Sequence, residues 1–126
     1  MATSPSATRT AANPLLHILK DTLAASVRSD QTDLSARQLT VFLKVYLEPG
    51  TEHTVRGLAA DLNISKPAIT RALDRLEEFD LAKRETDPKD RRSVIVKKTP
   101  AGTSHLGTLN GYLNAASKAA DKLAKK

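Results

Sequence analysis

The chain has 126 residues, a length that fits one compact domain and excludes a second large one. Hydrophobic residues make up 40% and charged residues 27%, which excludes both a membrane-spanning and a wholly disordered composition. Lysine and arginine outnumber aspartate and glutamate by 20 to 14, so the formal net charge of +6 favours an anionic partner such as nucleic acid. The absence of cysteine excludes disulfides, thiolate metal sites and thiol-based redox sensing.

The N-terminal segment, residues 1–12, is rich in Ser, Thr and Ala, and we expect it to be a disordered tail. It lacks the apolar segment of a secretory signal. No apolar run elsewhere approaches the roughly 18 residues that a membrane span requires. We therefore expect an intracellular protein without a membrane partner.

Two helices are predicted in the first part of the chain. Asn13-Pro14 combines an N-cap with a first-turn proline and begins an N-terminal helix within residues 13–33. The apolar residues of this helix recur at helical spacing: Leu15, Leu16, Leu19, Leu23 and Val27. Ser35 caps the second helix, which ends at Glu48-Pro49-Gly50. Its predicted apolar face is Leu39, Phe42, Leu43, Tyr46 and Leu47.

Two short helices follow, joined by a tight turn. Thr54 begins the first, and Asn63 suits its left-handed end because Asn tolerates a positive φ. Its predicted inner stripe is Val55, Leu58, Ala59 and Leu62. Ser65 caps the second, which has Pro67 in its first turn and runs to about Phe79. The positions predicted to point inward are Ile69, Ala72, Leu73 and Leu76.

Beyond Asp80 the pattern becomes extended. Residues 81–86 and 93–98 predict two strands, and the polar segment 87–92 predicts the turn between them. Thr99-Pro100 repeats the cap-and-proline signal and begins a C-terminal helix, residues 101–126. One side of this helix carries Leu106, Leu109, Leu113, Ala116, Ala120 and Leu123. The predicted fold class is mainly α with a small β wing, in which residues 34–100 form a winged helix-turn-helix.

The second short helix of such a unit can lie in the major groove of DNA, where base edges present a distinguishable pattern of donors and acceptors. Its predicted outward face is Ser65, Lys66, Pro67, Ala68, Thr70, Arg71, Asp74 and Arg75. Small residues permit close approach, and Arg71 can donate two hydrogen bonds to guanine. Arg75 can instead pair with Glu78 along the helix.

The hairpin between Lys83 and Lys98 carries more basic than acidic residues. Its predicted DNA-contacting residues are Arg84, Lys89, Asp90, Arg91 and Arg92. An arginine at a hairpin tip fits the narrow minor groove, so Arg92 is predicted there, held in an extended pose by Asp90. Arg84 is predicted to contact a phosphate, which gives affinity without sequence preference.

The sequence resembles the MarR (multiple antibiotic resistance regulator) family of winged helix-turn-helix transcription regulators. The resemblance is carried by Leu58-Ala59 to Leu62 and by SKPAITRALDRLEEFDLAKRETDPKDRRSVIVKKTPAG, from Ser65 to Gly102. It implies major-groove contacts by Pro67, Ala68, Thr70 and Arg71, and a wing-tip contact by Arg92, oriented by Asp90. Three features depart from the family pattern: Asp80 replaces a glycine, Lys98 replaces a leucine, and the segment after Gly102 is short.

The combined interpretation is a sequence-specific regulator of transcription that binds duplex DNA, with repression favoured over activation. We expect a homodimer on an inverted repeat, in the cytoplasm at a bacterial nucleoid. The helices within 13–33 and 101–126 would pair with those of a second copy, and this is favoured over packing of the C-terminal helix on its own core.

Two alternatives stay open: a protein-interaction module that antagonises another regulator, and a nonspecific architectural DNA binder. No enzyme, metal site or cofactor is predicted, because His17, His53 and His105 are scattered and the glycines form no phosphate loop. The sequence leaves a small-molecule effector undetermined.

Overall fold

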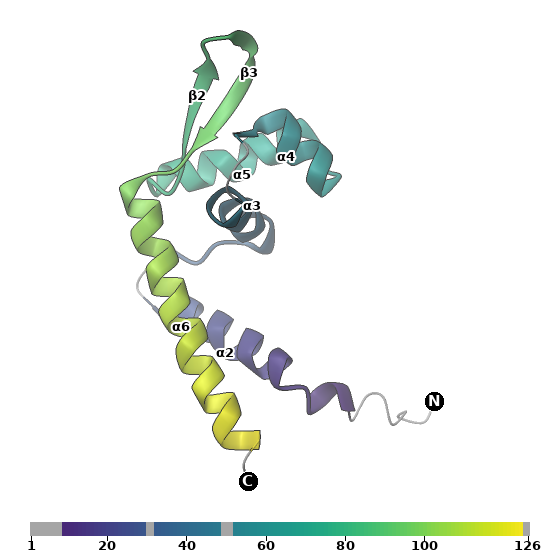
Figure 1. Ribbon diagram of the computed structural model, residues 1–126, viewed down its shortest axis with the longest axis vertical. Coiled ribbons are helices and arrows are strands. Elements are labelled where there is room, and N and C mark those ends of the chain that lie inside the picture. The colour runs from purple at the N-terminus through teal and green to yellow at the C-terminus, as the bar shows by residue number, and fades with distance from the viewer. Residues whose placement is uncertain (1–8, 30–31, 49–51, 125–126) are drawn as a thin grey trace. The chain divides into compact units, whose positions relative to one another are not determined.

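The computed structural model describes residues 9–29, 32–48 and 52–124 (Figure 1). They fall into two compact units, which are described separately. The central unit spans Leu34–Leu106, and the terminal unit consists of the described residues within Met1–Asp33 and Gly107–Lys126. No helix in the described ranges is both long enough and apolar enough to cross a membrane.

The central unit is a winged helix-turn-helix, as predicted. Its helices and strands are α3 (Ala36–Leu47), β1 (His53–Thr54), α4 (Val55–Leu62), α5 (Lys66–Glu78), β2 (Lys83–Asp87), β3 (Asp90–Lys97) and the start of α6 (Pro100–Ala124). The two helices α4 and α5 form the helix-turn-helix, and the β2–β3 hairpin is the wing (Figure 1). The predicted fold class is therefore confirmed.

The predicted helix starts are confirmed by side-chain caps. Ser35 forms a capping box with Gln38: the Gln38 N–H donates to Ser35 Oγ at 3.1 Å and the Ser35 N–H donates to Gln38 Oε1 at 3.0 Å. Thr54 and Ser65 cap α4 and α5 with their hydroxyl oxygens alone, which accept from the N–H groups of Gly57 and Ala68. Asn63 ends α4 in the left-handed conformation, with φ 54°.

The core of the central unit is built from the apolar faces of α3, α4 and α5. Its largest fully buried side chains are Val41, Phe42, Leu58, Ile69, Leu73 and Leu76. The prediction for α3 was wrong at its last position, because Leu47 is 59% exposed while Val41 and Val45 are buried. At 100° per residue, Leu47 lies about 140° around the helix from Phe42, which is too far from the centre of the buried face.

The sheet has three strands in the order β1-β3-β2, so the predicted two-stranded hairpin was incomplete. Strand β1 pairs antiparallel with β3, with His53 opposite Val96. Sequence patterns missed β1 because two residues are too few to display an alternation.

The strand limits in the wing also differ from those predicted. Residues 87 and 90–92 belong to the strands, which leaves only Pro88 and Lys89 between them. The sequence predicted a turn at these positions because their side chains are polar. An exposed outer wing needs no alternation of apolar and polar residues to form strands. Leu81 and Ala82, predicted in the first strand, instead precede β2 and are buried in the core.

Asp80 forms the turn between α5 and the wing in the left-handed conformation, with φ 59°. The Leu81 N–H closes this turn by donating to the carbonyl of Leu76 at 2.8 Å. The resemblance led us to expect a glycine here, and the backbone has the conformation that glycine favours. Aspartate is among the few other residues that tolerate it.

Asp80→Gly should therefore raise the free energy of unfolding by about 0.5 kcal/mol, since relief of left-handed strain exceeds the added entropy of the unfolded chain. Asp80→Ala should lower it by about 1 kcal/mol, because alanine keeps the Cβ but lacks the local hydrogen bonding of aspartate. Urea unfolding of the three proteins tests this. A glycine variant less stable than the alanine variant would contradict the assignment.

A buried hydrogen-bond network holds the turn at Asp80 against the start of α6. The Tyr46 hydroxyl donates to the carbonyl of Leu81 at 2.8 Å and accepts from the Thr99 N–H at 3.0 Å. The Thr99 hydroxyl donates to the carbonyl of Asp80 at 2.6 Å and accepts from the Gly102 N–H at 2.9 Å. Thr99 is thus the predicted helix cap, and the network ties together α3, the turn and α6.

The terminal unit contains α2 (Pro14–Arg28), which begins at the predicted cap Asn13, and most of α6. The prediction of a disordered tail over 1–12 was wrong for residues 9–11, which are helical, while residues 1–8 lie outside the described ranges. An Nε2–O contact of 2.8 Å between His17 and the carbonyl of Ala11 supports this extra turn. Pro49 and Gly50 also lie outside the described residues.

The apolar stripe of α2 is exposed in the single chain. Its members are Leu15, Leu16, Leu19, Leu23 and Val27, of which Leu15 is 69% and Val27 66% exposed. On α6, Leu109, Ala116 and Ala120 are buried, whereas Leu113 and Leu123 are exposed. The apolar stripe of α2 is therefore not covered by other described residues of the same chain.

Candidate nucleic-acid interface

The N-terminal half of α5 presents most of the residues predicted to contact DNA. Lys66, Pro67 and Arg71 are exposed and Thr70 is half-buried. The exposed Ser65 is the N-cap, because its Oγ accepts from the Ala68 N–H at 3.2 Å. The helix therefore offers polar side chains at its positive end.

Ala68 does not belong to this surface, which corrects the sequence prediction. It is only 5% exposed and lies in the core of the central unit. Ala68, Ala72 and Leu76 follow each other at intervals of four residues, so they share the buried face of α5. The small side chain of Ala68 serves packing against the core and is not available to a base edge.

The two arginines of α5 are in different electrostatic situations. Arg75 Nη1 lies 3.3 Å from Glu78 Oε2, as the alternative interpretation predicted, and its guanidinium carbon lies 4.4 Å from the centre of the Phe79 ring. Arg71 is exposed, and no acidic side chain in the described ranges pairs with it. Arg71 is therefore the guanidinium on α5 that is free to bind a ligand.

The wing tip carries the predicted basic residues in exposed positions: Lys89, Arg91 and Arg92. The side chain of Arg92 is 92% exposed. Asp90 Oδ1 accepts a hydrogen bond from the Arg92 N–H at 3.1 Å and lies 3.9 Å from Arg92 Nε. Asp90 thus shapes the backbone of the tip and leaves the guanidinium of Arg92 open to solvent.

Arg84, which the sequence predicts to contact a phosphate, is engaged with acidic side chains of the protein itself. Its Nε lies 3.0 Å from Glu77 Oε1, and its Nη2 lies 3.1 Å from Glu77 Oε2 and 2.5 Å from Asp74 Oδ1. Its backbone N–H also donates to Glu77 Oε1 at 2.7 Å. The side chain is only 23% exposed. These contacts occupy the fork that a phosphate would need.

The hydrogen bonds from Arg84 hold the pKa of the Glu77 carboxyl below its usual value, against the opposing effect of partial burial. Since the pKa is lower in the folded state, this contribution to stability is complete above the unfolded-state value of about 4.3 and is lost as the pH falls through the folded-state pKa. Glu77→Gln should flatten the loss of stability below about pH 4.3. Unfolding measured between about pH 6 and about pH 3 tests this. A variant whose free energy of unfolding falls as steeply as that of wild type below about pH 4.3 would contradict the assignment.

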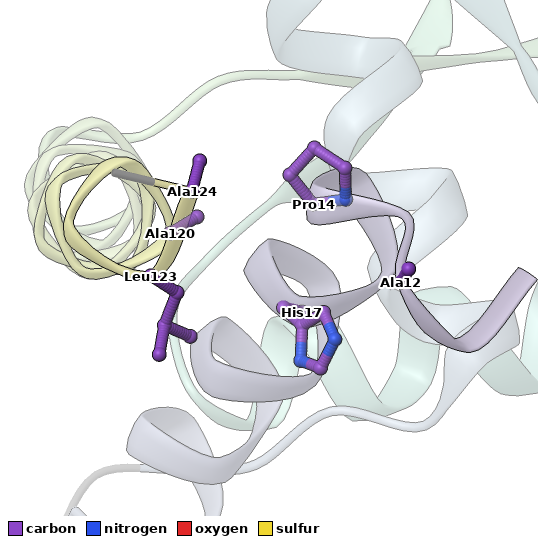
Figure 2. Close-up of a pocket in the computed structure, with 6 residues that line it drawn as sticks. All are labelled: Ala12, Pro14, His17, Ala120, Leu123 and Ala124. Carbon is purple, nitrogen blue, oxygen red and sulfur yellow. The ribbon is translucent and has the colours of Figure 1, made fainter. Parts of the chain in front are cut away.

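The terminal unit contains an open pocket of about 140 Å³ between the start of α2 and the end of α6 (Figure 2). It is lined by Ala12, Pro14, His17, Ala120, Leu123 and Ala124. The lining contains no Lys, Arg, Asp or Glu to select a charged ligand. In the described part of the chain, no cluster of three or more His, Asp or Glu residues is placed to hold a metal ion.

Residues 34–94 match the sequence model of the MarR family. A structure of Staphylococcus aureus MepR in complex with DNA is 17% identical, with 95% of this chain and 92% of that one covered and a TM-score of 0.67. A transcriptional regulator from Thermotoga maritima is 19% identical, with coverages of 95% and 82% and a TM-score of 0.72. MarR from Escherichia coli is 21% identical, with coverages of 97% and 85% and a TM-score of 0.66.

A search of curated protein sequences found no match. At identities near 20% the structural likenesses establish the fold, and the sequence match supplies the family. The match covers α3, β1, the helix-turn-helix and most of the wing. Residues 34–94 of this chain are therefore a winged helix-turn-helix domain of the MarR family.

Proposed function

We propose that this chain is a sequence-specific regulator of transcription that binds duplex DNA, with α5 in the major groove and the wing at the minor groove. The observation that carries the proposal is the pair Arg71 and Arg92, whose guanidinium groups are exposed on the two elements that would contact DNA. Both arginines belong to the domain that matches the MarR family of transcription regulators.

In the major groove, Arg71 would donate two hydrogen bonds to a guanine. Thr70 and Pro67 would contact neighbouring bases, and Lys66 at the start of α5 would hold a phosphate beside the helix N-terminus. The exposed polar side of α5 is free for this role because its apolar residues face the core.

In the minor groove, Arg92 would enter the narrow, electronegative channel beside the site. Lys89 and Arg91 would contact the flanking phosphates, which position the protein without selecting a sequence. We place the regulator in the cytoplasm, at the chromosome, and favour repression, since a bound domain of this kind blocks access to the DNA that it covers.

The DNA-bound form would be a homodimer joined through the terminal unit. All the large apolar side chains that are exposed in the described residues, except Leu47, lie on α2 and α6. Such a concentration of exposed apolar surface is typical of an interface between proteins. A two-fold dimer would place two copies of α5 about 34 Å apart, on the two halves of an inverted repeat.

Titration of a labelled duplex of mixed sequence tests the DNA-binding part of the proposal. We expect binding that weakens on the order of 10³-fold between 50 and 200 mM salt, as about six phosphate contacts per dimer would give. Absence of binding at the lower salt concentration would contradict the proposal and favour the protein-interaction alternative. Equal affinity for all sequences would favour the architectural alternative.

The dimer is tested by measuring the mass in solution at micromolar protein. Wild type should be a dimer, and Leu19→Glu should be a monomer, because it places a charge in the exposed apolar stripe of α2. Lys20→Gln on the adjacent exposed position is the control and should remain a dimer. A monomeric wild type would eliminate the inverted-repeat prediction.

A further inference from the structure

Arg84 lies where the wing leaves the body of the central unit. The residues at the base of the wing, Leu81, Ala82, Ile95 and Val96, are buried in the core. Beyond Arg84 on β2, Glu85 and Thr86 are exposed, and the pairing with β3 is irregular between Thr86 and Asp87. The contacts of Arg84 with Glu77 and Asp74 are thus the outermost tie between the wing and α5 in the described part of the chain.

The geometry of this tie is directional. The Arg84 guanidinium binds Glu77 through two nitrogens, while the backbone N–H of the same residue binds Glu77 as well. An arginine fork on a carboxylate restricts orientation as well as distance, which a lysine cannot do. The tie therefore restrains the angle at which β2 leaves α5.

The same tie controls a charge on the exposed side of α5. Asp74 is 60% exposed and lies three residues after Arg71, so the two side chains are neighbours on one face of the helix. Without a cationic partner, the Asp74 carboxylate would compete with a base for the guanidinium of Arg71. Arg84 Nη2, 2.5 Å from Asp74 Oδ1, supplies that partner.

We propose that Arg84 is a positioning residue for DNA recognition: it fixes the wing relative to α5, so that Arg71 and Arg92 reach adjacent grooves of one site together, and it keeps Asp74 away from Arg71. This inference rests on the proposed DNA-binding function and assigns Arg84 a role other than the phosphate contact predicted from the sequence. Loss of the Arg84 contacts should weaken binding to the specific site only. Both roles serve the simultaneous contact of Arg71 and Arg92 with that one site.

Arg84→Lys separates this role from a phosphate contact. Lysine keeps the positive charge and would serve a phosphate equally well, but it cannot form the two-nitrogen contact. We expect the affinity for the specific duplex to fall about tenfold while the affinity for a mixed-sequence duplex changes less than about twofold. Glu77→Gln, which removes the charge of the Arg84 partner on α5, should also lower the affinity for the specific duplex selectively. Glu85→Gln, an exposed change on the same strand, is the control and should preserve the ratio of the two affinities.

A distance measurement without DNA tests the positioning separately. Because the chain has no cysteine, Glu78→Cys and Lys89→Cys provide unique sites for two spin labels, on α5 and at the wing tip. The distance distribution should be narrow with Arg84 and clearly broader with Arg84→Lys, and Glu85→Gln should leave it narrow. This result does not depend on DNA binding, so a failed function and a failed positioning role are distinguishable.

Two outcomes would overturn the proposal. One is an Arg84→Lys protein that keeps the narrow distance distribution. The other is an Arg84→Lys protein that loses specific and nonspecific affinity to the same extent, which would restore the role of Arg84 as a phosphate contact. Circular dichroism of each variant confirms that it is folded at the temperature of the binding assay.

Discussion

Replacing Gly102 by alanine is expected to lower the free energy of unfolding by about 3–5 kcal/mol, an overpacking cost added to the loss of buried hydrogen bonds. A Cβ atom at this position would overlap the hydroxyl of Tyr46 and would lie 2.5 Å from the carbonyl oxygen of Leu81. Both atoms belong to the network that joins α3, the turn at Asp80 and α6. The added methyl group therefore cannot be accommodated by rotating one flexible side chain.

The other glycines of α6 provide matched controls. A Cβ atom at Gly107 or Gly111 meets no atom within 4 Å, and both residues lie inside the helix. Gly107→Ala and Gly111→Ala should each raise the free energy of unfolding by up to about 1 kcal/mol, because alanine has the higher helix propensity. Chemical unfolding of the three variants gives the comparison. Equal stability of Gly102→Ala and wild type would contradict the close packing around Gly102.

Replacing Arg71 by alanine is expected to remove base discrimination at one position of each half-site. The loss of a bidentate arginine–guanine contact costs about 1–3 kcal/mol, or on the order of 10- to 100-fold in affinity for that half-site. Affinity for duplexes that already lack this guanine should change much less. Titration of wild type and Arg71→Ala against single-base variants of the selected site measures the difference.

Arg28→Ala is the control for the change of charge, since Arg28 is exposed at the end of α2 in the terminal unit. It should preserve the base preference at every position. If Arg71→Ala weakens all single-base variants equally, Arg71 contacts a phosphate and another side chain of α5 selects the base.

The local structure was predictable wherever short-range chemistry decides it. The caps at Ser35, Thr54 and Ser65 and the left-handed Asn63 were found from residue type and spacing alone. Each depends on hydrogen bonds or backbone preferences within three residues of its own position. The core positions of α5 were found for the same reason, since a helical stripe is a local pattern.

Features that depend on distant partners were not predictable. The strand β1 exists only because β3 lies beside it, and the left-handed turn at Asp80 is held by contacts with Thr99. The acidic partners of Arg84, Asp74 and Glu77, lie on α5 and not on its own strand. Local sequence patterns could not reveal them and suggested only a phosphate contact. Ala68 was assigned to the wrong face because its size permits both packing in the core and contact with DNA.

The exposed stripe of α2 shows a further limit of sequence patterns. Leu15, Leu19 and Leu23 have the spacing of a core-facing helix, and yet they are exposed in the single chain. A hydrophobic stripe predicts that a face will be covered and leaves open whether the cover comes from the same chain or from another. The measurement of mass in solution decides this.

The central claim, that α5 and the wing select a DNA sequence, is tested most directly by selection of binding sites from random duplex DNA at near-physiological salt. The bound fraction is sequenced after each round and compared with the starting pool. We expect enrichment of an inverted repeat whose half-sites lie about one helical turn apart. Measurable binding without enrichment of any sequence would contradict the claim.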